Sequence, residues 1–341
     1  MTSRVASPIR LAVVACLATL VPESATSAEE PFEIGAAAAS QLRHAQLRIV
    51  GGQLLATTNE ARTSAYNRSD AQRQEKLTLG NEGSLVTLHY ELSTPAARLS
   101  YDIARGRDVR LQYQAQGDAP SEELEYTQQT DGPSRLRIAE GELVVERSGP
   151  SFYHVLLSLT PEQRERPIWL IEFIRRQWKL DEKLSVLNFN LLRSEYAPSP
   201  VTRQQLAGWI RQLGSNHFSE RQAAERSLRA AGQGVLPLLR EAERGRLDAE
   251  QRFRLRSILQ ASGDDQQDDT VERASAALSV DPYLWYALLQ RERLVRQFAV
   301  RRLSQLLGEP IDFDPLADVS TRQAQFEKLD GQLRRMLSLT E

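Results

Sequence analysis

Histidine is the residue best suited to proton transfer near neutral pH, and this chain contains four of them. They are His44, His89, His154 and His217. No pair has the i, i+4 spacing that places two zinc ligands on one helix face, and no H-E-x-x-H motif occurs. A G-x-S-x-G motif, from which Ser-His-Asp catalysis could start, is also missing. We therefore expect no catalytic residues, no metal and no cofactor, so the sequence predicts a protein that is not an enzyme.

A hydrolase with an unfamiliar site stays open as an alternative. Tyr153 and His154 are adjacent, and a carboxylate such as Glu172 could orient the imidazole. Only the fold can show whether these groups meet.

Two groups of aspartates could supply the oxygen ligands that calcium takes. They are Asp264, Asp265, Asp268 and Asp269, and then Asp312, Asp314 and Asp318. The first group lacks the glycine and the distal glutamate of a calcium loop, so we interpret it as a polar linker. The second surrounds Asp314-Pro315, which is typical of a turn.

The densest basic cluster has two interpretations. It consists of Arg291, Arg293, Arg296, Arg301 and Arg302. The arginines could pair with acids such as Glu292 or Asp281, or they could line a groove for an anionic partner. We take them as a candidate partner-binding site.

The first 28 residues have the pattern of a secretory signal peptide. Arg4 and Arg10 precede the apolar run 11–21, and Thr26-Ser27-Ala28 supplies the small residues of a cleavage site. This run is shorter than the ~20 residues of a membrane span. We expect an exported protein, in the periplasm or cell envelope or secreted. Cys16, the only cysteine, could instead mark a lipidated N-terminus.

Charge argues against nucleic acid as a partner. The formal net charge is −2, without the strongly basic balance of most nucleic-acid-binding domains. A protein or another envelope component is the expected partner.

Up to about residue 149, strand-like segments flank turn residues. Four hairpins are predicted, with turns at Gly51-Gly52, Asn81–Gly83, Arg105-Gly106 and Glu140-Gly141. The first and last share the pattern L-R-I-x-x-G-x-L. Alternation of apolar and polar residues predicts an antiparallel sheet with one wet face. The polar stretches 59–75 and 118–130 are predicted as loops, and 36–44 as a short helix.

From residue 151 the apolar period becomes that of helices. Thr160 and Thr202 begin helices as capping residues, and Gly214, Gly232 and Gly245 mark helix ends. The spacing R-x-x-A-x-x-x-L occurs at Arg221 and returns at Arg296, and Arg252 begins a looser copy.

These residues, with F-x-x-R-x-x-A-x-x-x-L at 218–228 and LLGEPIDFDP at 306–315, resemble HEAT-like repeats of exported planctomycete proteins. The resemblance implies a helical-repeat solenoid without a defined activity. The predicted parts are a signal peptide at 1–28, a β-rich domain at 45–149, a helical connector at 151–196, HEAT-like helices at 201–262, and a C-terminal helical repeat with a closing helix at 270–340.

The sequence thus predicts an α+β multidomain protein, with an antiparallel β-rich domain followed by a HEAT-like α-helical array. Solenoids mostly bind other molecules. The expected function is a non-enzymatic binding or scaffold protein that presents its helices to a protein or envelope partner. The alternative is an envelope glycan- or lipid-binding module that uses the β-rich domain.

Overall fold

The computed structural model describes residues 33–58, 63–117, 121–130, 132–175, 178–194, 201–232, 235–243, 245–261 and 269–337. The predicted signal peptide and Cys16 lie outside these residues. The chain divides into two units, Met1–Glu33 and Ile34–Glu341, and every element below belongs to the second. Among the residues described, no helix combines the length and the apolar character that crossing a membrane requires.

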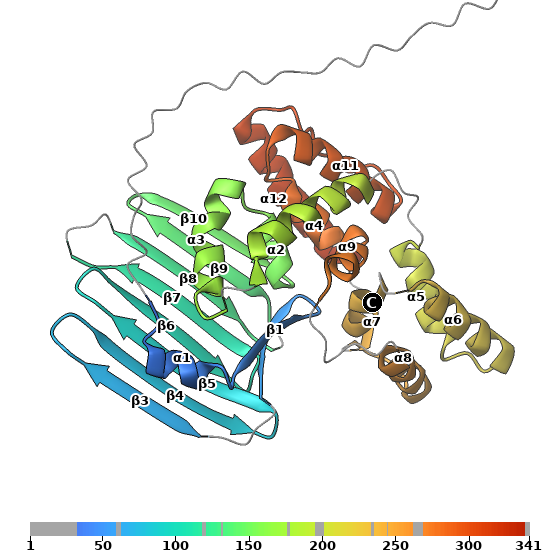
Figure 1. The fold of residues 1–341 in the computed structure, drawn as a ribbon. Helices are drawn as coiled ribbons and strands as arrows, with labels where there is room; N and C mark the ends of the chain where they lie inside the picture. Colours follow the sequence, from blue (N-terminus) through green and yellow to red (C-terminus); the bar gives the residue numbers. More distant parts are fainter. Residues whose placement is uncertain are drawn as a thin grey trace, which may run out of the picture. The chain divides into compact units, whose positions relative to one another are not determined.

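The N-terminal part of the second unit is one antiparallel sheet after a short helix, α1 (Ala36–Leu42). The strands are β1 (Gln46–Val50), β2 (Gln53–Thr57), β3 (Ser64–Ser69), β4 (Gln74–Glu82), β5 (Leu85–Ser93), β6 (Ala97–Ala104), β7 (Asp108–Ala115), β8 (Glu122–Gln128), β9 (Ser134–Glu140) and β10 (Leu143–Gly149). Strands β3 to β10 pair in sequence order, and the β1–β2 hairpin joins at β5. Figure 1 shows this sheet in blue to green.

All four predicted hairpins are present, but two segments predicted as loops contain strands. β3 and the start of β4 lie within 59–75, and β8 lies within 118–130. These segments carry too few apolar residues to show a strand pattern, and their backbone pairing with β4, β7 and β9 makes them strands.

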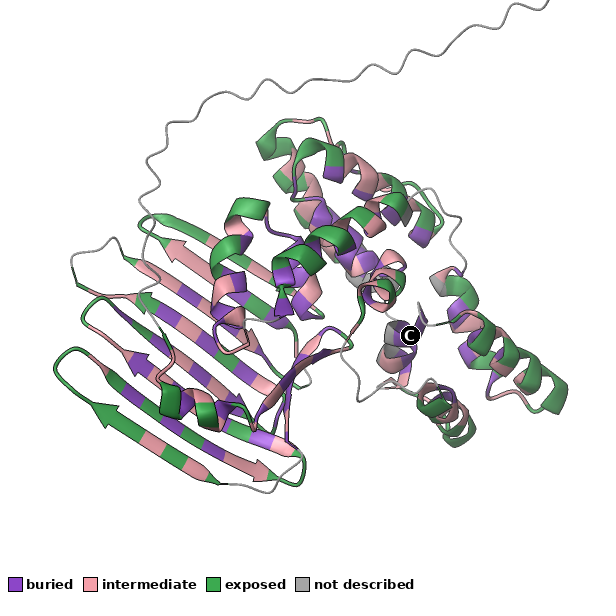
Figure 2. Ribbon diagram, viewed as in Figure 1, coloured by how far each residue is buried: buried purple, intermediate pink, exposed green. Residues whose placement is uncertain are grey.

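The two faces of the sheet differ sharply in composition. On one face Leu88, Tyr90, Tyr101 and Tyr126 are buried. The alternate residues form a polar face, where His89 Nδ1 lies 2.5 Å from an oxygen of Asp102. The predicted wet face is therefore confirmed, and Figure 2 shows the alternation along the strands.

Gln128 attaches the β1–β2 hairpin to the rest of the sheet. Its side-chain Oε1 accepts from Leu54 N, and its Nε2 donates to Leu54 O, both at 2.8 Å. The backbone pairing of β2 with β5 involves only Thr57 and Leu85. A buried side-chain amide thus takes the place of a neighbouring strand and fixes the hairpin.

The C-terminal part is helical, so the coarse prediction of an α+β chain is correct. The helices are α2 (Phe152–Leu157), α3 (Pro161–Glu172), α4 (Leu180–Ser194), α5 (Arg203–Gln212), α6 (Phe218–Ala230), α7 (Leu236–Glu243), α8 (Ala249–Ala261), α9 (Val271–Ser279), α10 (Pro282–Leu288), α11 (Arg293–Leu307) and α12 (Val319–Leu337). The predicted caps at Thr160 and Thr202 are confirmed, and each forms a capping box with the glutamine three residues later.

Helices α2 and α3 cover the apolar face of the sheet (Figure 1). Phe152 meets Tyr126 edge to face at 6.1 Å, and Trp169 meets Tyr113 in the same way at 5.5 Å. The buried hydroxyl of Tyr101 donates to the carbonyl of Leu170. Each phenol body is therefore packed, and the polar tip of Tyr101 is paired, as burial requires.

Helices α5 to α8 enclose an apolar cluster of their own. Its buried members include Leu206, Leu213, Leu228, Leu239 and Leu255. The apolar stripes expected from the 3.6-residue period therefore bury themselves by helix-on-helix packing.

Candidate functional site

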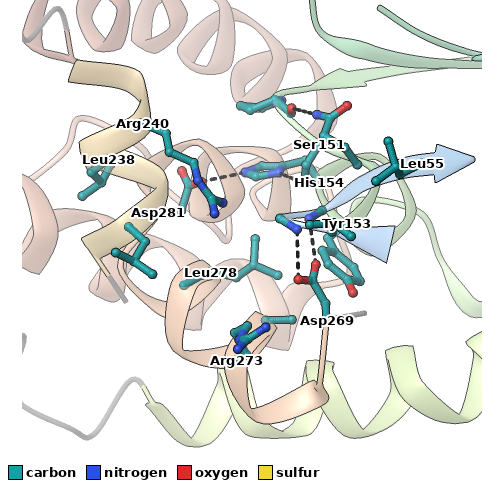
Figure 3. A pocket seen from close by; sticks show the side chains of 18 of the residues that line it. Leu55, Ser151, Tyr153, His154, Leu238, Arg240, Asp269, Arg273, Leu278 and Asp281 are labelled. Carbon is teal, nitrogen blue, oxygen red and sulfur yellow. Dashed lines mark hydrogen bonds and ion pairs between the residues drawn. The ribbon is translucent and has the colours of Figure 1, made fainter. Parts of the chain in front are cut away.

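A cavity of about 710 Å³ lies where the β1–β2 hairpin meets the helices (Figure 3). We call it the hairpin cavity. Its walls come from the turn at Gly51-Gly52, the junction of β10 with α2, and helices α7, α8 and α9. Its polar lining includes Arg107, Gln128, Ser151, His154, Arg240, Glu243, Arg256, Asp269, Arg273 and Asp281. Its apolar lining includes Leu54, Leu55, Leu236, Leu238, Leu259 and Leu278.

A hydrogen-bonded chain of serine, histidine and aspartate lines this cavity. Ser151 Oγ lies 2.8 Å from Nδ1 of His154, and Nε2 of His154 lies 3.1 Å from Oδ2 of Asp281. A carboxylate only accepts, so the neutral imidazole that fits this arrangement has its proton on Nε2. In that tautomer Nδ1 is an acceptor, and the Ser151 hydroxyl donates to it. We call this the Ser151–His154–Asp281 chain.

Local structure explains why these three residues have their positions. Ser151 is the N-cap of α2, but its side chain caps no backbone N–H and turns to His154 instead. Asp281 is the N-cap of α10, where its other oxygen accepts from Tyr283 N at 2.9 Å. His154 thus joins the starts of two helices that are far apart in sequence. All three side chains are buried, and His154 is only 2% exposed.

Asp269 binds the turn of the β1–β2 hairpin. Its carboxylate accepts from Gly51 N at 2.9 Å and from Gly52 N at 2.7 Å, and its own N–H donates to Ile49 O at 2.7 Å. Gly51 and Gly52 both have positive φ, which points their consecutive N–H groups toward one acceptor. Burial raises the pKa of Asp269 above its usual value, and the two N–H bonds oppose this shift.

Arginines from three helices border the same space. The charges of Arg273 and Arg240 lower the pKa of Asp269, although less than burial raises it. Nη1 of Arg240 lies 2.7 Å from the point that a Cβ on Gly51 would occupy, so Arg240 lies against the hairpin turn. Arg256 is paired with Glu243 at 2.7 Å. Figure 3 shows Arg240 and Arg273 extending into the cavity from α7 and α9.

The five arginines predicted as a partner site have mixed surroundings. Arg291 and Arg302 are buried; Arg291 Nη1 donates to Leu157 O at 2.6 Å, and Arg302 Nε donates to Ser279 O at 3.1 Å. Arg296 is partly buried and donates to Pro315 O, whereas Arg293 and Arg301 are exposed. Arg291 and Arg302 therefore hold the fold together, and partner binding by this cluster stays a prediction.

The other candidate residues are spread over the fold. Glu172, suggested as a partner of His154, accepts from Leu180 N at 2.5 Å and does not line the hairpin cavity. Of the first aspartate group, only Asp269 lies within the described residues. In the second group, Lys328 bonds Asp312, while Asp314 and Asp318 accept from backbone N–H groups. The described residues contain no cluster of potential metal ligands.

Sequence reasoning identified His154 but not its partners. Ser151 and His154 have the i, i+3 spacing of a capping box, which could have suggested their contact. Asp281 is 127 residues away from His154, and nothing in the sequence indicates that the two side chains meet.

Comparisons with protein-family models, curated proteins and solved structures found no match to this chain.

Proposed function

We propose that this protein is an exported, non-enzymatic binding protein, and that the hairpin cavity is its binding site. Small-molecule sites typically enclose ~300–1,000 Å³ and combine apolar walls with a few converging polar groups. The hairpin cavity has about 710 Å³ and is lined in that way. This observation carries the proposal.

The position of the cavity bears on the kind of binding. Its walls combine the β1–β2 hairpin with helices, so a ligand would contact both parts of the chain. The position of the cavity therefore supports a ligand-binding protein more than it supports a scaffold that contacts its partner through the helical surface alone. Export, and a source of the ligand in the cell envelope, remain part of the proposal.

We further propose that the helices are HEAT-like units. The arginines of the repeated motif support this, because each donates to a carbonyl in the loop before its own helix. Arg221 reaches Ser215 O at 2.6 Å, Arg252 reaches Leu247 O at 3.2 Å, and Arg296 reaches Arg291 O at 2.5 Å. The recurring arginine thus ties each helix to the turn before it.

Filling the cavity tests the binding proposal. Ala277 lines the cavity, whereas its neighbour Ala276 is exposed and does not. The full chain, Ala277→Trp and Ala276→Trp would be purified without denaturation and analysed by native mass spectrometry. We expect a small molecule bound to the full chain and to Ala276→Trp but not to Ala277→Trp. Absence of any bound molecule, or equal retention by both variants, would contradict the proposal.

A serine hydrolase is the second candidate, favoured by the Ser151–His154–Asp281 chain. Ser151 Oγ would attack an acyl carbon and pass its proton to Nδ1 of His154, while Asp281 holds the imidazole. The protonated imidazole would then protonate the leaving group, and water would release the acyl group from Ser151.

A fluorophosphonate probe separates the two candidates, because it labels only activated serines. Ser158 is a matched control, since it is buried at the end of the same helix and donates to Val155 O at 2.7 Å. Labelling of the full chain and of Ser158→Ala, but not of Ser151→Ala, would identify a hydrolase. Failure of the probe to label any of the three is the outcome expected of a binding protein.

A further inference from the structure

We infer that the hairpin cavity binds an amphipathic carboxylate, and that Asp269 occupies the head-group site when the ligand is absent. The inference rests on the proposed function, because it requires the cavity to be a binding site. It adds the chemical class of the ligand and names the groups that would recognise it.

The head-group site consists of the backbone N–H groups of Gly51 and Gly52, which bind the Asp269 carboxylate in this structure. The N–H groups of Gly51 and Gly52 both donate to Asp269, at 2.9 and 2.7 Å. Consecutive N–H groups that converge in this way form an anion-binding concavity. A ligand carboxylate has the same two oxygens, so it could replace the Asp269 side chain without any change in hydrogen-bond pattern.

The charge around this site also favours an anion. Four arginines line the cavity, against Glu243, Asp269 and Asp281. Each of these carboxylates already accepts hydrogen bonds: Glu243 from Arg256, Asp269 from the hairpin turn, and Asp281 from Tyr283. Arg240 and Arg273 act electrostatically on Asp269 and would act in the same way on a carboxylate that replaced it.

The rest of the cavity suits an apolar body. Six leucines line its walls: Leu54, Leu55, Leu236, Leu238, Leu259 and Leu278. Five of them are buried, each 8% exposed or less, and Leu259 is partly buried. A polar ligand would leave these walls without favourable contacts, whereas a short alkyl chain would bury its surface against them.

Octanoate is a suitable probe, with octanol as the uncharged analogue of the same length. Isothermal titration at neutral pH would compare the full chain with Arg240→Gln, Arg273→Gln and the control Arg246→Gln. Arg246 is exposed and does not line the cavity. We expect octanoate to bind at least about tenfold tighter than octanol, and each cavity variant to lose about tenfold in affinity, because a charge-assisted bond contributes ~1.4 kcal/mol or more. Arg246→Gln should bind like the full chain.

Removal of the Asp269 carboxylate tests whether Asp269 competes with the ligand for the head-group site. Asp269→Ser empties the head-group site, so we expect it to bind octanoate about tenfold tighter than the full chain does. Circular dichroism would show whether Asp269→Ser is folded. If this variant does not fold, the arginine variants still test the inference.

Several outcomes would overturn the inference and leave the proposed function standing. Equal binding of octanol, or no loss in the arginine variants, would make the cavity a purely apolar site. Octanoate binding that persists in Ala277→Trp would place the acid outside the cavity. Failure of octanoate to bind, when another molecule is found in the cavity by mass spectrometry, would show that the ligand class is wrong. An empty cavity in that experiment would instead contradict the proposed function itself.

Discussion

Asp269 is a single residue with two opposing influences on its charge. Burial disfavours the carboxylate, and the hairpin N–H groups with Arg273 and Arg240 favour it. Burial is the largest of these effects, and the pKa is raised. The pKa of this carboxyl is near 4 in the unfolded chain and higher in the folded protein. At a pH between these two pKa values, the folded protein therefore binds more protons than the unfolded chain does.

This raised pKa makes a prediction about stability and pH. The contribution of Asp269 to the free energy of unfolding should fall as pH rises from about 4 through the native pKa, and then level off. Urea unfolding of the full chain and of Asp269→Asn across pH 4 to 7 would measure it. Asp269→Asn should gain stability relative to the full chain as pH increases.

Asp70 supplies a comparison of opposite sign. The backbone N–H of Gln72 lowers the pKa of its exposed carboxyl, so its contribution should be lost as pH falls. An Asp269→Asn profile parallel to that of the full chain would argue against the raised pKa.

Individual residues also show where sequence reasoning stops. His154 could be selected from its type, but its orientation depends on Asp281, which the fold brings from a distant helix start. The sequence left two interpretations of the arginine cluster open, pairing with acids such as Glu292 or lining a groove for an anion, and Arg291 does pair with Glu292 at 2.8 Å. Arg291 and Arg302 are also buried with carbonyl partners, a role that charge patterns along one helix do not reveal.

At the scale of elements, two hairpins share one sequence pattern but not one environment. Gly52 and Gly141 are equivalent in L-R-I-x-x-G-x-L, and both have positive φ, at 74° and 57°. A Cβ on Gly52 would lie 2.8 Å from Ser151, whereas a Cβ on Gly141 would meet nothing within 4 Å. The sequence predicted both turns correctly, but the packing around them depends on the helices.

This pair gives a prediction with its own control. Gly141→Ala should cost about 1 kcal/mol, from the left-handed backbone alone. Gly52→Ala should cost about 2–4 kcal/mol, because the clash with Ser151 adds to that strain. Denaturant unfolding would measure both values. Equal costs would mean that Ser151 and its helix move aside freely.

Strands without an apolar pattern were the main omission at this scale. β3 has exposed or half-exposed residues throughout, and β8 carries Glu122, Glu123 and Glu125. Pairing with neighbouring strands creates such elements, and pairing is a property of the assembled sheet. The helices, in contrast, carry capping boxes and apolar stripes within their own sequence, so their positions could be predicted.

At the scale of the molecule, Arg291 links distant parts of the helical region. It begins the stretch before α11, and its guanidinium donates to the carbonyl of Leu157 at the end of α2. Glu292 accepts from the same side chain at 2.8 Å. Removal of the Arg291 side chain would take this hydrogen-bond donor away from the carbonyl of Leu157.

We therefore predict that Arg291→Ala lowers the free energy of unfolding by about 2–4 kcal/mol. Arg293→Ala, which removes an exposed guanidinium two residues away, should change it by less than about 0.5 kcal/mol. Urea titrations of the two variants and the full chain would measure the difference. Similar values for both variants would show that the buried bond contributes little.

The junction of β10 and α2 has a consequence for shortened forms of this chain. Only Pro150 and Ser151 separate the last strand from the helix whose Phe152 packs on Tyr126. A polypeptide that stopped at 149 would contain every strand that the structure describes and helix α1, but it would lack α2 and α3, which cover Tyr126, Tyr113 and Tyr101. Such a fragment should aggregate or require detergent. We therefore expect that the sheet stays soluble during synthesis only after α2 and α3 have been made and cover its apolar face.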